Sequence, residues 1–253
     1  MKAVFKTDRG RVRQHNEDSG GVFINRSGQR LAIVADGMGG HRAGDVASEM
    51  TLANLKMLWG NTEEIQKADE AEEWLKLNIA KVNEILFEHS KTFSECEGMG
   101  TTVVAVICTD RFSTVASVGD SRCYILNETG FQQLTEDHSL VNELVRSGQI
   151  SKEDAEHHPM KNVVLRALGT EETVVMDIKT IIFEDDDILL LCSDGLSNKV
   201  NEMEMLGILK SDKSLDEKAA KLIDLANDHG GEDNITLIIV EFLDGSESGD
   251  EQC

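Results

Sequence analysis

The stretch Leu31-Ala-Ile-Val-Ala-Asp36-Gly37 joins an unbroken apolar run to an aspartate and a glycine. Runs of this length, bounded by turn residues, are typical of strands that are buried on both faces. Three more runs have the same character, at residues 101–108, 187–194 and 235–240. We therefore expect a core of short, buried strands with polar turns at their ends.

Two further stretches, residues 113–120 and 174–183, also read as strands because apolar and polar residues partly alternate. Helical spacing of apolar residues marks a helix over residues 70–92, where Leu75, Ile79, Val82 and Leu86 share one face. Other helices are expected at residues 42–59, 139–147 and 214–227. The last begins with a capping-box pattern from Ser214 to Glu217 and is stopped by Gly230 and Gly231.

Strands and helices do not alternate strictly along the chain, which favours an α+β layered fold over a parallel α/β sheet. The chain has 253 residues, with one proline and 21 glycines, and no stretch before the C-terminus resembles a linker. We expect a single domain over residues 1–243. The polar, acidic residues 244–253 are expected to form a disordered tail.

The formal net charge is −22 at pH 7, which repels nucleic acid and anionic membrane surfaces. A phosphorylated substrate is an anion too, so an acidic protein that handles phosphate needs a local positive centre, and bound cations can supply it. No signal peptide or run of about 18 apolar residues is present. Five cysteines without a CxxC pair indicate neither disulfides nor a zinc site, and a cytoplasmic location is expected.

Aspartates stand where the apolar runs begin or end. Asp36, Asp120 and Asp194 end such runs, Asp233 precedes the last one, and Glu17 and Asp18 precede a shorter apolar segment. A single Asp-Gly after a strand is most often only a turn. Several of them at neighbouring strand ends would repel one another without cations, and carboxylate oxygens suit Mg²⁺ or Mn²⁺ better than zinc.

With these motifs the sequence resembles the PPM family of metal-dependent serine/threonine phosphatases (protein phosphatase 2C-like), in the stand-alone form of Gram-positive bacteria. The motifs occur in the family's order: Arg13 to Asp18 (RQHNED), Val34 to His41 (VADGMGGH), Gly98 to Thr102 (GMGTT), Val118 to Arg122 (VGDSR), Leu134 to Ser139 (LTEDHS), Cys192 to Leu196 (CSDGL) and Glu232 to Thr236 (EDNIT). The resemblance implies a four-layer α-β-β-α sandwich of two central antiparallel sheets flanked by helix pairs.

The resemblance also implies a site for two to three divalent cations, Mn²⁺ or Mg²⁺. The implied ligands are Asp36 as the bridge between two cations, the backbone carbonyl of Gly37, Asp194 and Asp233 at the first cation, Glu17 at the second, and Asp120 with Asp194 at the third. Asp18 could be a further ligand, could form a turn, or could support the ligands without touching a cation, as Asn234 would. A water shared by two cations would attack phosphorus directly, without a phospho-enzyme.

Arg13 is the residue implied to clamp the substrate phosphate with its planar guanidinium. The family's proton donor for the leaving group is less easily assigned, because the position directly after Asp36-Gly37 holds Met38, not histidine. His41 could take this role, a cation-bound water could take it, or His41 could simply pack at the start of a helix. His138 is expected to be structural.

Residues 139–168 correspond to the family's flap, which lies beside the site, although an ordinary helical connection would also fit. The implied partners are phosphorylated proteins, including a membrane-anchored Ser/Thr kinase and its substrates, and a monomer is expected. Two other functions fit the sequence less well. A two-metal nuclease is disfavoured by the acidic charge, and a non-catalytic module would lack Asp36, Asp194 or Asp233, all of which are present.

Overall fold

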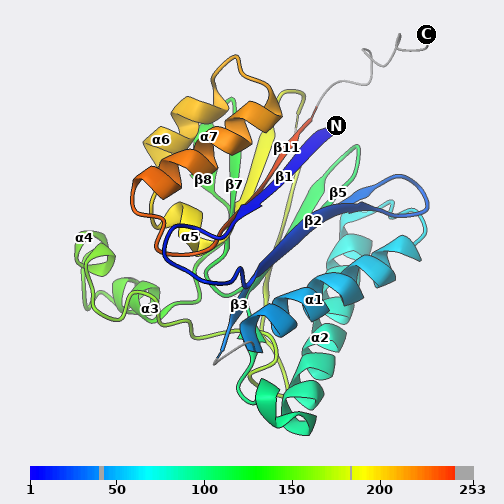
Figure 1. Ribbon diagram of the computed structural model, residues 1–253. Helices are drawn as coiled ribbons and strands as arrows, with labels where there is room; N and C mark the ends of the chain where they lie inside the picture. The colour runs from blue at the N-terminus through cyan, green and yellow to red at the C-terminus, as the bar shows by residue number, and fades with distance from the viewer. Residues whose placement is uncertain (40–42, 183, 243–253) are drawn as a thin grey trace.

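Two antiparallel sheets packed face to face form the centre of the computed structural model, which describes residues 1–39, 43–182 and 184–242 (Figure 1). One sheet has the strand order β1 (Lys2–Asp8), β11 (Ile235–Glu241), β10 (Ile188–Cys192), β7 (Arg122–Asn127) and β8 (Gly130–Gln133). The other has the order β2 (Asp18–Ile24), β3 (Arg30–Met38), β5 (Val103–Cys108), β6 (Ser113–Val118) and β9 (Asp177–Ile181), with β4 (Gly100–Thr101) paired to β3.

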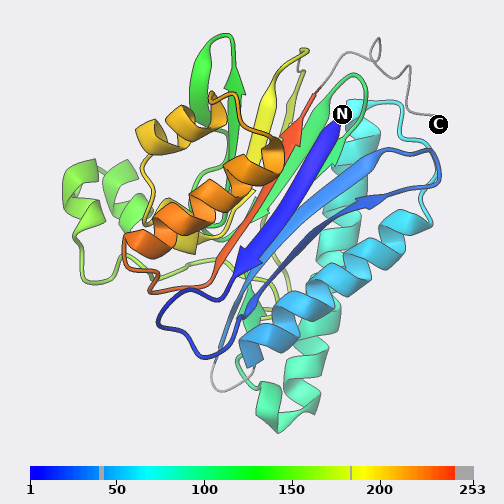
Figure 2. The same cartoon turned by 45° about the horizontal axis from the view of Figure 1, so that its top comes forward.

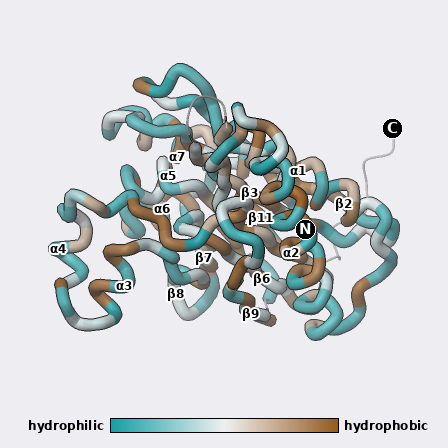
Figure 3. The backbone as a smooth tube through the Cα atoms, turned by 90° about the horizontal axis from the view of Figure 1, so that it is seen from below, coloured by the Kyte–Doolittle hydropathy of each residue, from teal (hydrophilic) through white to brown (hydrophobic). Residues whose placement is uncertain are grey.

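Helices cover the outer face of each sheet (Figure 2). The β2–β9 sheet is covered by α1 (Ala43–Gly60) and α2 (Ala68–Thr92), with a short 3-10 helix at Ser94–Cys96. The other sheet is covered by α5 (Asp194–Ser197), α6 (Glu202–Leu209) and α7 (Leu215–Asp228). Two short helices, α3 (Leu140–Arg146) and α4 (Lys152–Glu156), project to one side of the sandwich (Figures 1 and 3).

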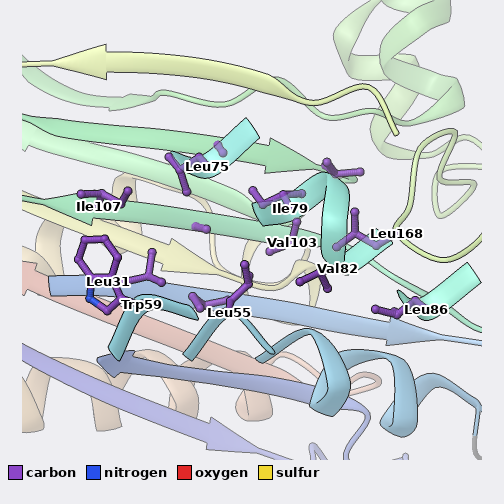
Figure 4. Packing of buried hydrophobic residues seen from close by; sticks show 14 of the residues in the cluster. Leu31, Leu55, Trp59, Leu75, Ile79, Val82, Leu86, Val103, Ile107 and Leu168 are labelled. Carbon is purple, nitrogen blue, oxygen red and sulfur yellow. The ribbon is translucent and has the colours of Figure 1, made fainter. Parts of the chain in front are cut away.

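The continuous apolar run of β3 is explained by this layering, because both faces of the strand are covered. Leu31 and Ile33 pack on the side of α1 and α2, against Trp59, Leu75 and other residues in Figure 4. Ala32 and Val34 belong instead to the core between the two sheets. Since successive side chains of a strand point to opposite faces, a strand between two apolar layers needs apolar residues at every position.

The predicted α+β sandwich with flanking helices is confirmed. The helices predicted at residues 70–92, 139–147 and 214–227 correspond to α2, α3 and α7, and that predicted at 42–59 corresponds to α1. Ser214 and Glu217 form the expected capping box, and Gly230 and Gly231 follow α7 with φ of 124° and 56°. The predicted tail, residues 244–253, lies outside the described residues.

Four strands went unrecognised in the sequence: β1, β2, β7 and β8. In β1 only Val4 is buried, since this edge strand is covered on one face, and β8 contains no buried residue. The strand predicted at residues 174–183 is shorter than expected, because only Asp177–Ile181 pairs with β6. Half-covered edge strands carry a weaker apolar signal than central ones.

Candidate active site

Five aspartates meet at one end of the sandwich, where the central strands begin or end. Asp18 and Asp36 lie directly opposite each other in the β2–β3 pair. Asp120 follows β6, Asp194 follows β10 as the first residue of α5, and Asp233 lies just before β11. The sandwich therefore brings together carboxylates that are up to 215 positions apart in the chain, from Asp18 to Asp233.

The backbone of Asp36 is held by two neighbouring threonines. Its N–H donates to Thr102 Oγ1 at 3.1 Å, and its carbonyl accepts from Thr101 Oγ1 and from the Thr102 N–H, each at 2.9 Å. Thr102 Oγ1 also lies 2.7 Å from Ser121 Oγ, in the turn that carries Asp120. Threonine hydroxyls thus tie the positions of Asp36 and Asp120 to each other.

Gly37 and Gly44 allow the turn after β3 to approach the start of α1. A Cβ added to Gly37 would lie 2.1 Å from the Gly44 carbonyl oxygen and 2.6 Å from that of Glu17. A Cβ on Gly44 would lie 3.0 Å from Glu17 Cδ. The Gly37 N–H and the Ser48 hydroxyl both donate to the Glu17 carbonyl. Glycine is therefore required here by close backbone packing, which fixes Glu17 beside Asp36.

Asp18 is the most enclosed member of the cluster, with 8% of its surface exposed. Its Oδ2 accepts from Ser193 Oγ at 2.7 Å, and Ser193 Oγ in turn accepts from the Thr236 N–H at 3.0 Å. Burial raises the pKa of Asp18 to about 7, the Ser193 hydrogen bond partly offsets this, and Asp194 and Asp233 add to the rise. The folded protein therefore disfavours the charged form of Asp18, because the site is buried and the neighbouring aspartates repel a further negative charge.

Asp194 sits at the start of α5, where Oδ2 accepts from Asn198 Nδ2 at 3.0 Å. Close packing against the loop before β11 fixes this turn, because a Cβ on Gly195 would lie 1.9 Å from the Asn234 carbonyl oxygen. Burial raises the pKa of Asp194, and the charge of Asp233 raises it further. Asp194 and Asp233 are therefore close enough for their charges to interact strongly.

Asp233 forms an ion pair with Arg13, with Nη2 and Oδ2 2.8 Å apart. The loop between β1 and β2, which carries Arg13, is fastened by Asn234: its Nδ2 donates to the carbonyls of Arg9 and His15, and its Oδ1 accepts from the Glu17 N–H. Asn234 is 4% exposed. One buried amide thus places both Arg13 and Glu17 beside the aspartates.

Asp120 is 9% exposed, and burial followed by the charges of Asp194 and Asp137 raises its pKa to about 7. Asp137 itself makes a forked pair with Arg122, at 2.7 to 3.1 Å. The Gly119 N–H donates to His138 Nδ1 at 3.1 Å, and the His138 N–H donates back to the Gly119 carbonyl. His138 is thus a structural residue that connects the Asp120 turn to the start of the flap.

The donor set suits hard divalent cations. Burial, and then Asp18, Asp194, Asp120 and Asp233 in that order, raise the pKa of Asp36 well above its ordinary value. Asp18 Oδ1 and Asp194 Oδ1 are buried and lack a hydrogen-bond partner within the described part of the chain. Buried carboxylate oxygens without partners are costly, and a cation that accepts them removes both the desolvation cost and the mutual repulsion.

Side chains at this end nevertheless make contacts within the protein that compete with cation binding. Asp233 is engaged by Arg13, Asp194 by Asn198 and Asp18 by Ser193. Over residues 1–39, 43–182 and 184–242, no three His, Cys, Asp or Glu side chains are arranged as ready ligands of one ion. Cation binding would therefore require rotations of side chains such as Asp233, while the backbone positions already converge.

The four cysteines in the described part of the chain do not qualify as nucleophiles. Cys96, Cys108, Cys123 and Cys192 are free and buried. Burial raises the pKa of the Cys108 thiol to about 11 and that of Cys192 to about 12. Such thiols are protonated at neutral pH and do not act as nucleophiles.

A protein phosphatase 2C family model matches residues 7–234, which covers most of the chain. The chain belongs to the protein phosphatase 2C family. It is 54% identical over 241 residues to the serine/threonine phosphatase stp of Listeria welshimeri, covering 95% of this chain and 96% of that protein. Family membership confirms the prediction of a protein serine/threonine phosphatase.

Solved structures of the family agree with the fold. The serine/threonine phosphatase Stp1 from Staphylococcus aureus matches with a TM-score of 0.91 at 38% identity, covering 95% of this chain and 94% of that one. The catalytic domain of the phosphatase PstP, in complex with two manganese ions, matches with a TM-score of 0.82 at 32% identity, covering 96% and 98%. Within the described residues, no helix is long and apolar enough to span a membrane.

Of the residues named from sequence, the structure brings together Arg13, Glu17, Asp18, Asp36, Gly37, Asp120, Asp194, Asp233 and Asn234. His41 lies outside the described residues. Asp18 is embedded more deeply among the other carboxylates than its sequence position indicated. Thr101, Thr102 and Ser193 had no role in the sequence analysis, although each lies within a family motif. Their hydroxyls hold backbones or carboxylates, which spacing alone does not reveal.

Asp18 offers a test of the charge cluster by stability. Its pKa is about 7 in the folded protein and 3.8 ordinarily. A carboxyl with a raised pKa ionises first in the unfolded chain, so folded stability falls as pH rises from about 4 to about 7. In buffer that contains a chelator, the Asp18→Asn protein should therefore melt about 2–5 °C higher than the wild type at pH 8, and the difference should be smaller at pH 4. Calorimetric melts of both proteins from pH 4 to 8 measure this; a gain that does not grow with pH would contradict it.

Proposed function

We propose that the aspartate cluster binds divalent cations and hydrolyses phosphoserine and phosphothreonine in proteins by direct attack of water. The observation that carries the proposal is the convergence of five aspartates, Glu17 and the exposed Arg13 at one end of the sandwich. Oxygen donors in this number suit Mn²⁺ or Mg²⁺. The similar phosphatase PstP, which is in complex with two manganese ions, supports two such cations here, and the family resemblance adds a third.

The ligand assignments are those that the family resemblance implies for the matching positions of this sequence. Asp36, on which the charges of four other aspartates act, would bind both catalytic cations. Asp194 and Asp233, whose charges interact, would hold the first cation together with the Gly37 carbonyl. Glu17 would hold the second cation, and Asp120 with Asp194 would hold the third. Asp18 and Asn234 support these residues through Ser193 and through the loop backbone.

The catalytic cations, when bound, lower the pKa of a shared water and offset the charge that develops on the phosphoryl oxygens. The protein's own contribution is to position them and to orient the substrate. Arg13 lies beside the aspartates, where 47% of its side chain is exposed and its guanidinium pairs with Asp233. If Asp233 ligated a cation instead, the Arg13 guanidinium would be free to hold two phosphate oxygens. The proton donor to the leaving group stays unassigned between His41 and water.

We place the protein opposite a Ser/Thr kinase, because a protein serine/threonine phosphatase removes the phosphate that such a kinase adds. A membrane-anchored kinase and a cytoplasmic site of action are carried over from the family resemblance. Free cysteines in the described chain fit a reducing compartment. The alternative of a nuclease is disfavoured by the net charge of −22. Assays on phosphothreonine peptides and on single-stranded DNA, each with Mn²⁺ and with a chelator, separate the two activities.

Asp36→Asn and Asp194→Ala should each lower Mn²⁺-dependent kcat/KM on a phosphothreonine peptide by more than about 100-fold, because each removes a direct cation ligand. Asp110→Asn is the matched control, since Asp110 is exposed in the β5–β6 turn. Steady-state kinetics and a melting curve for each variant provide the readouts. Retention of full activity by a folded Asp36→Asn or Asp194→Ala protein would refute the assigned centre.

Arg13→Ala should weaken substrate binding more than the chemical step, because the guanidinium contacts phosphate in both the ground and the transition state. We expect KM for a phosphothreonine peptide to rise about tenfold, in keeping with lost charge-assisted hydrogen bonds. Arg111→Ala, at an exposed arginine in the β5–β6 turn, is the control. An unchanged KM and kcat in Arg13→Ala would show that another group holds the phosphate.

Asp120→Ala should remove one cation and leave two. Asp120 interacts with Asp194 and Asp137 and lies on the β6–β7 turn, whereas Glu17 lies in the β1–β2 loop. Isothermal titration calorimetry with Mn²⁺ on both proteins measures the number of ions bound. Loss of all Mn²⁺ binding in the variant, or no loss at all, would contradict a separate third site.

A further inference from the structure

The loop between β1 and β2 gathers positive charge in a protein that is strongly acidic as a whole. Within residues 9–15, Arg9, Arg11, Arg13 and His15 are all exposed. Arg13 pairs with Asp233, but neither Arg9 nor Arg11 forms an ion pair within the described residues. Most other described arginines, such as Arg26, Arg122, Arg146 and Arg166, do pair with a carboxylate.

Contacts inside the loop hold it against the end of α7 and the start of β11. The N–H groups of Arg11 and Val12 donate to the Gly231 carbonyl, at 2.7 and 3.2 Å. Asn234 binds the carbonyls of Arg9 and His15. At Gly10, φ is 80° and a Cβ would lie 2.1 Å from the Asp233 carbonyl oxygen, so the loop fits closely here. Its arginines are therefore presented from a fixed backbone.

The nearest acidic side chain in the loop's own sequence is already engaged elsewhere. Asp8 Oδ1 accepts from the Gly10 N–H at 2.8 Å and from Asn227 Nδ2 at 3.1 Å. Arg9 bonds only to a backbone carbonyl, that of Gln14, and the stem of Arg11 lies beside Gly231. Both guanidinium groups thus keep donors for an outside partner.

Distance along the chain limits how far these arginines lie from Arg13. An extended chain spans at most about 3.6 Å per residue, so the Cα of Arg11 is within about 7 Å of that of Arg13, and the Cα of Arg9 within about 14 Å. In an extended peptide, a residue two to four positions from the phosphoresidue lies at about the same distance from it, about 7 to 14 Å. Such a residue could therefore reach Arg9 or Arg11 while the phosphate is at Arg13. In Figure 1 the β1–β2 loop lies beside the loop that joins α7 to β11, which carries Asp233.

We propose that Arg9 and Arg11 form a basic rim that selects phosphoprotein segments with acidic residues flanking the phosphorylated serine or threonine. The inference rests on the proposed phosphatase site, because the rim can select a substrate only if the phosphorylated residue binds at that site. Carboxylates of the substrate would meet guanidinium donors locally, although the protein's overall charge of −22 repels them at a distance. Since screening lengths are about 8–10 Å at moderate salt, the near charges outweigh the remote ones.

Two phosphothreonine peptides of equal length test the rim. One carries glutamates and the other glutamines at positions two to four residues on each side of the phosphothreonine. The wild-type protein with Mn²⁺ should show a kcat/KM at least about fivefold higher on the glutamate peptide, the effect of two partly exposed charge pairs. In the double variant Arg9→Ala/Arg11→Ala this ratio should fall to about one, and in Arg9→Glu/Arg11→Glu below one.

Arg111→Ala, at an exposed and unpaired arginine of the β5–β6 turn, is the control and should keep the wild-type ratio. If the alanine variant melts early, Arg9→Gln/Arg11→Gln keeps the apolar stems and removes only the charges. A wild-type ratio of one or less, an unchanged ratio in the folded double variants, or an equal loss in Arg111→Ala would overturn the rim. Failure of the phosphatase proposal looks different, because then neither peptide is hydrolysed in a Mn²⁺-dependent manner.

Discussion

Repulsion between buried carboxylates is the constraint around which this end of the molecule is organised. The pairing of β2 with β3 sets Asp18 opposite Asp36, and β6, β10 and β11 add Asp120, Asp194 and Asp233. Burial and these neighbours raise the pKa of Asp36 well above its ordinary value. A cluster of this kind disfavours folding at neutral pH unless positive charge joins it, so the fold itself creates the demand for cations.

The sandwich withstands this cost because four of the five strands beside the aspartates, β3, β6, β10 and β11, are buried on both faces over most of their length. Apolar layers from α1 and α2, from the space between the sheets, and from α6 and α7 hold β3, β10 and β11 along their whole length. Hydroxyls and amides then fix the ends: Thr101 and Thr102 at Asp36, Ser193 at Asp18, and Asn234 at the β1–β2 loop. Apolar packing stabilises the sandwich, and these few hydrogen bonds fix the positions of the aspartates and of the β1–β2 loop.

The difference between apolar packing and the hydrogen bonds at the strand ends explains which features could be predicted from the sequence. The central strands β3, β5, β6, β10 and β11 and the helices α1, α2 and α7 were predictable because their apolar pattern is a direct consequence of being covered. The central strand β7 was missed although it is buried. The aspartates at strand ends followed from the strands, and their assignment as ligands came from the ordered family motifs. Edge strands β1 and β8 were missed because one exposed face or a short length removes that periodicity. The depth of Asp18 was missed too, since it depends on which strand lies opposite, a matter of register.

The pairing of Arg13 with Asp233 could not be read from sequence either, because it joins residues 220 positions apart. Because of this pair, Arg13 differs from the other two arginines of the β1–β2 loop. Arg13 faces the carboxylates and is neutralised by one of them, whereas Arg9 and Arg11 are turned to solvent from the same tightly held backbone. A cation that engages Asp233 would release Arg13 to the phosphate and leave three guanidinium groups along one loop. Positive charge would then extend from the reacting phosphate to the residues beside it, which no other described segment near the aspartates provides through arginine.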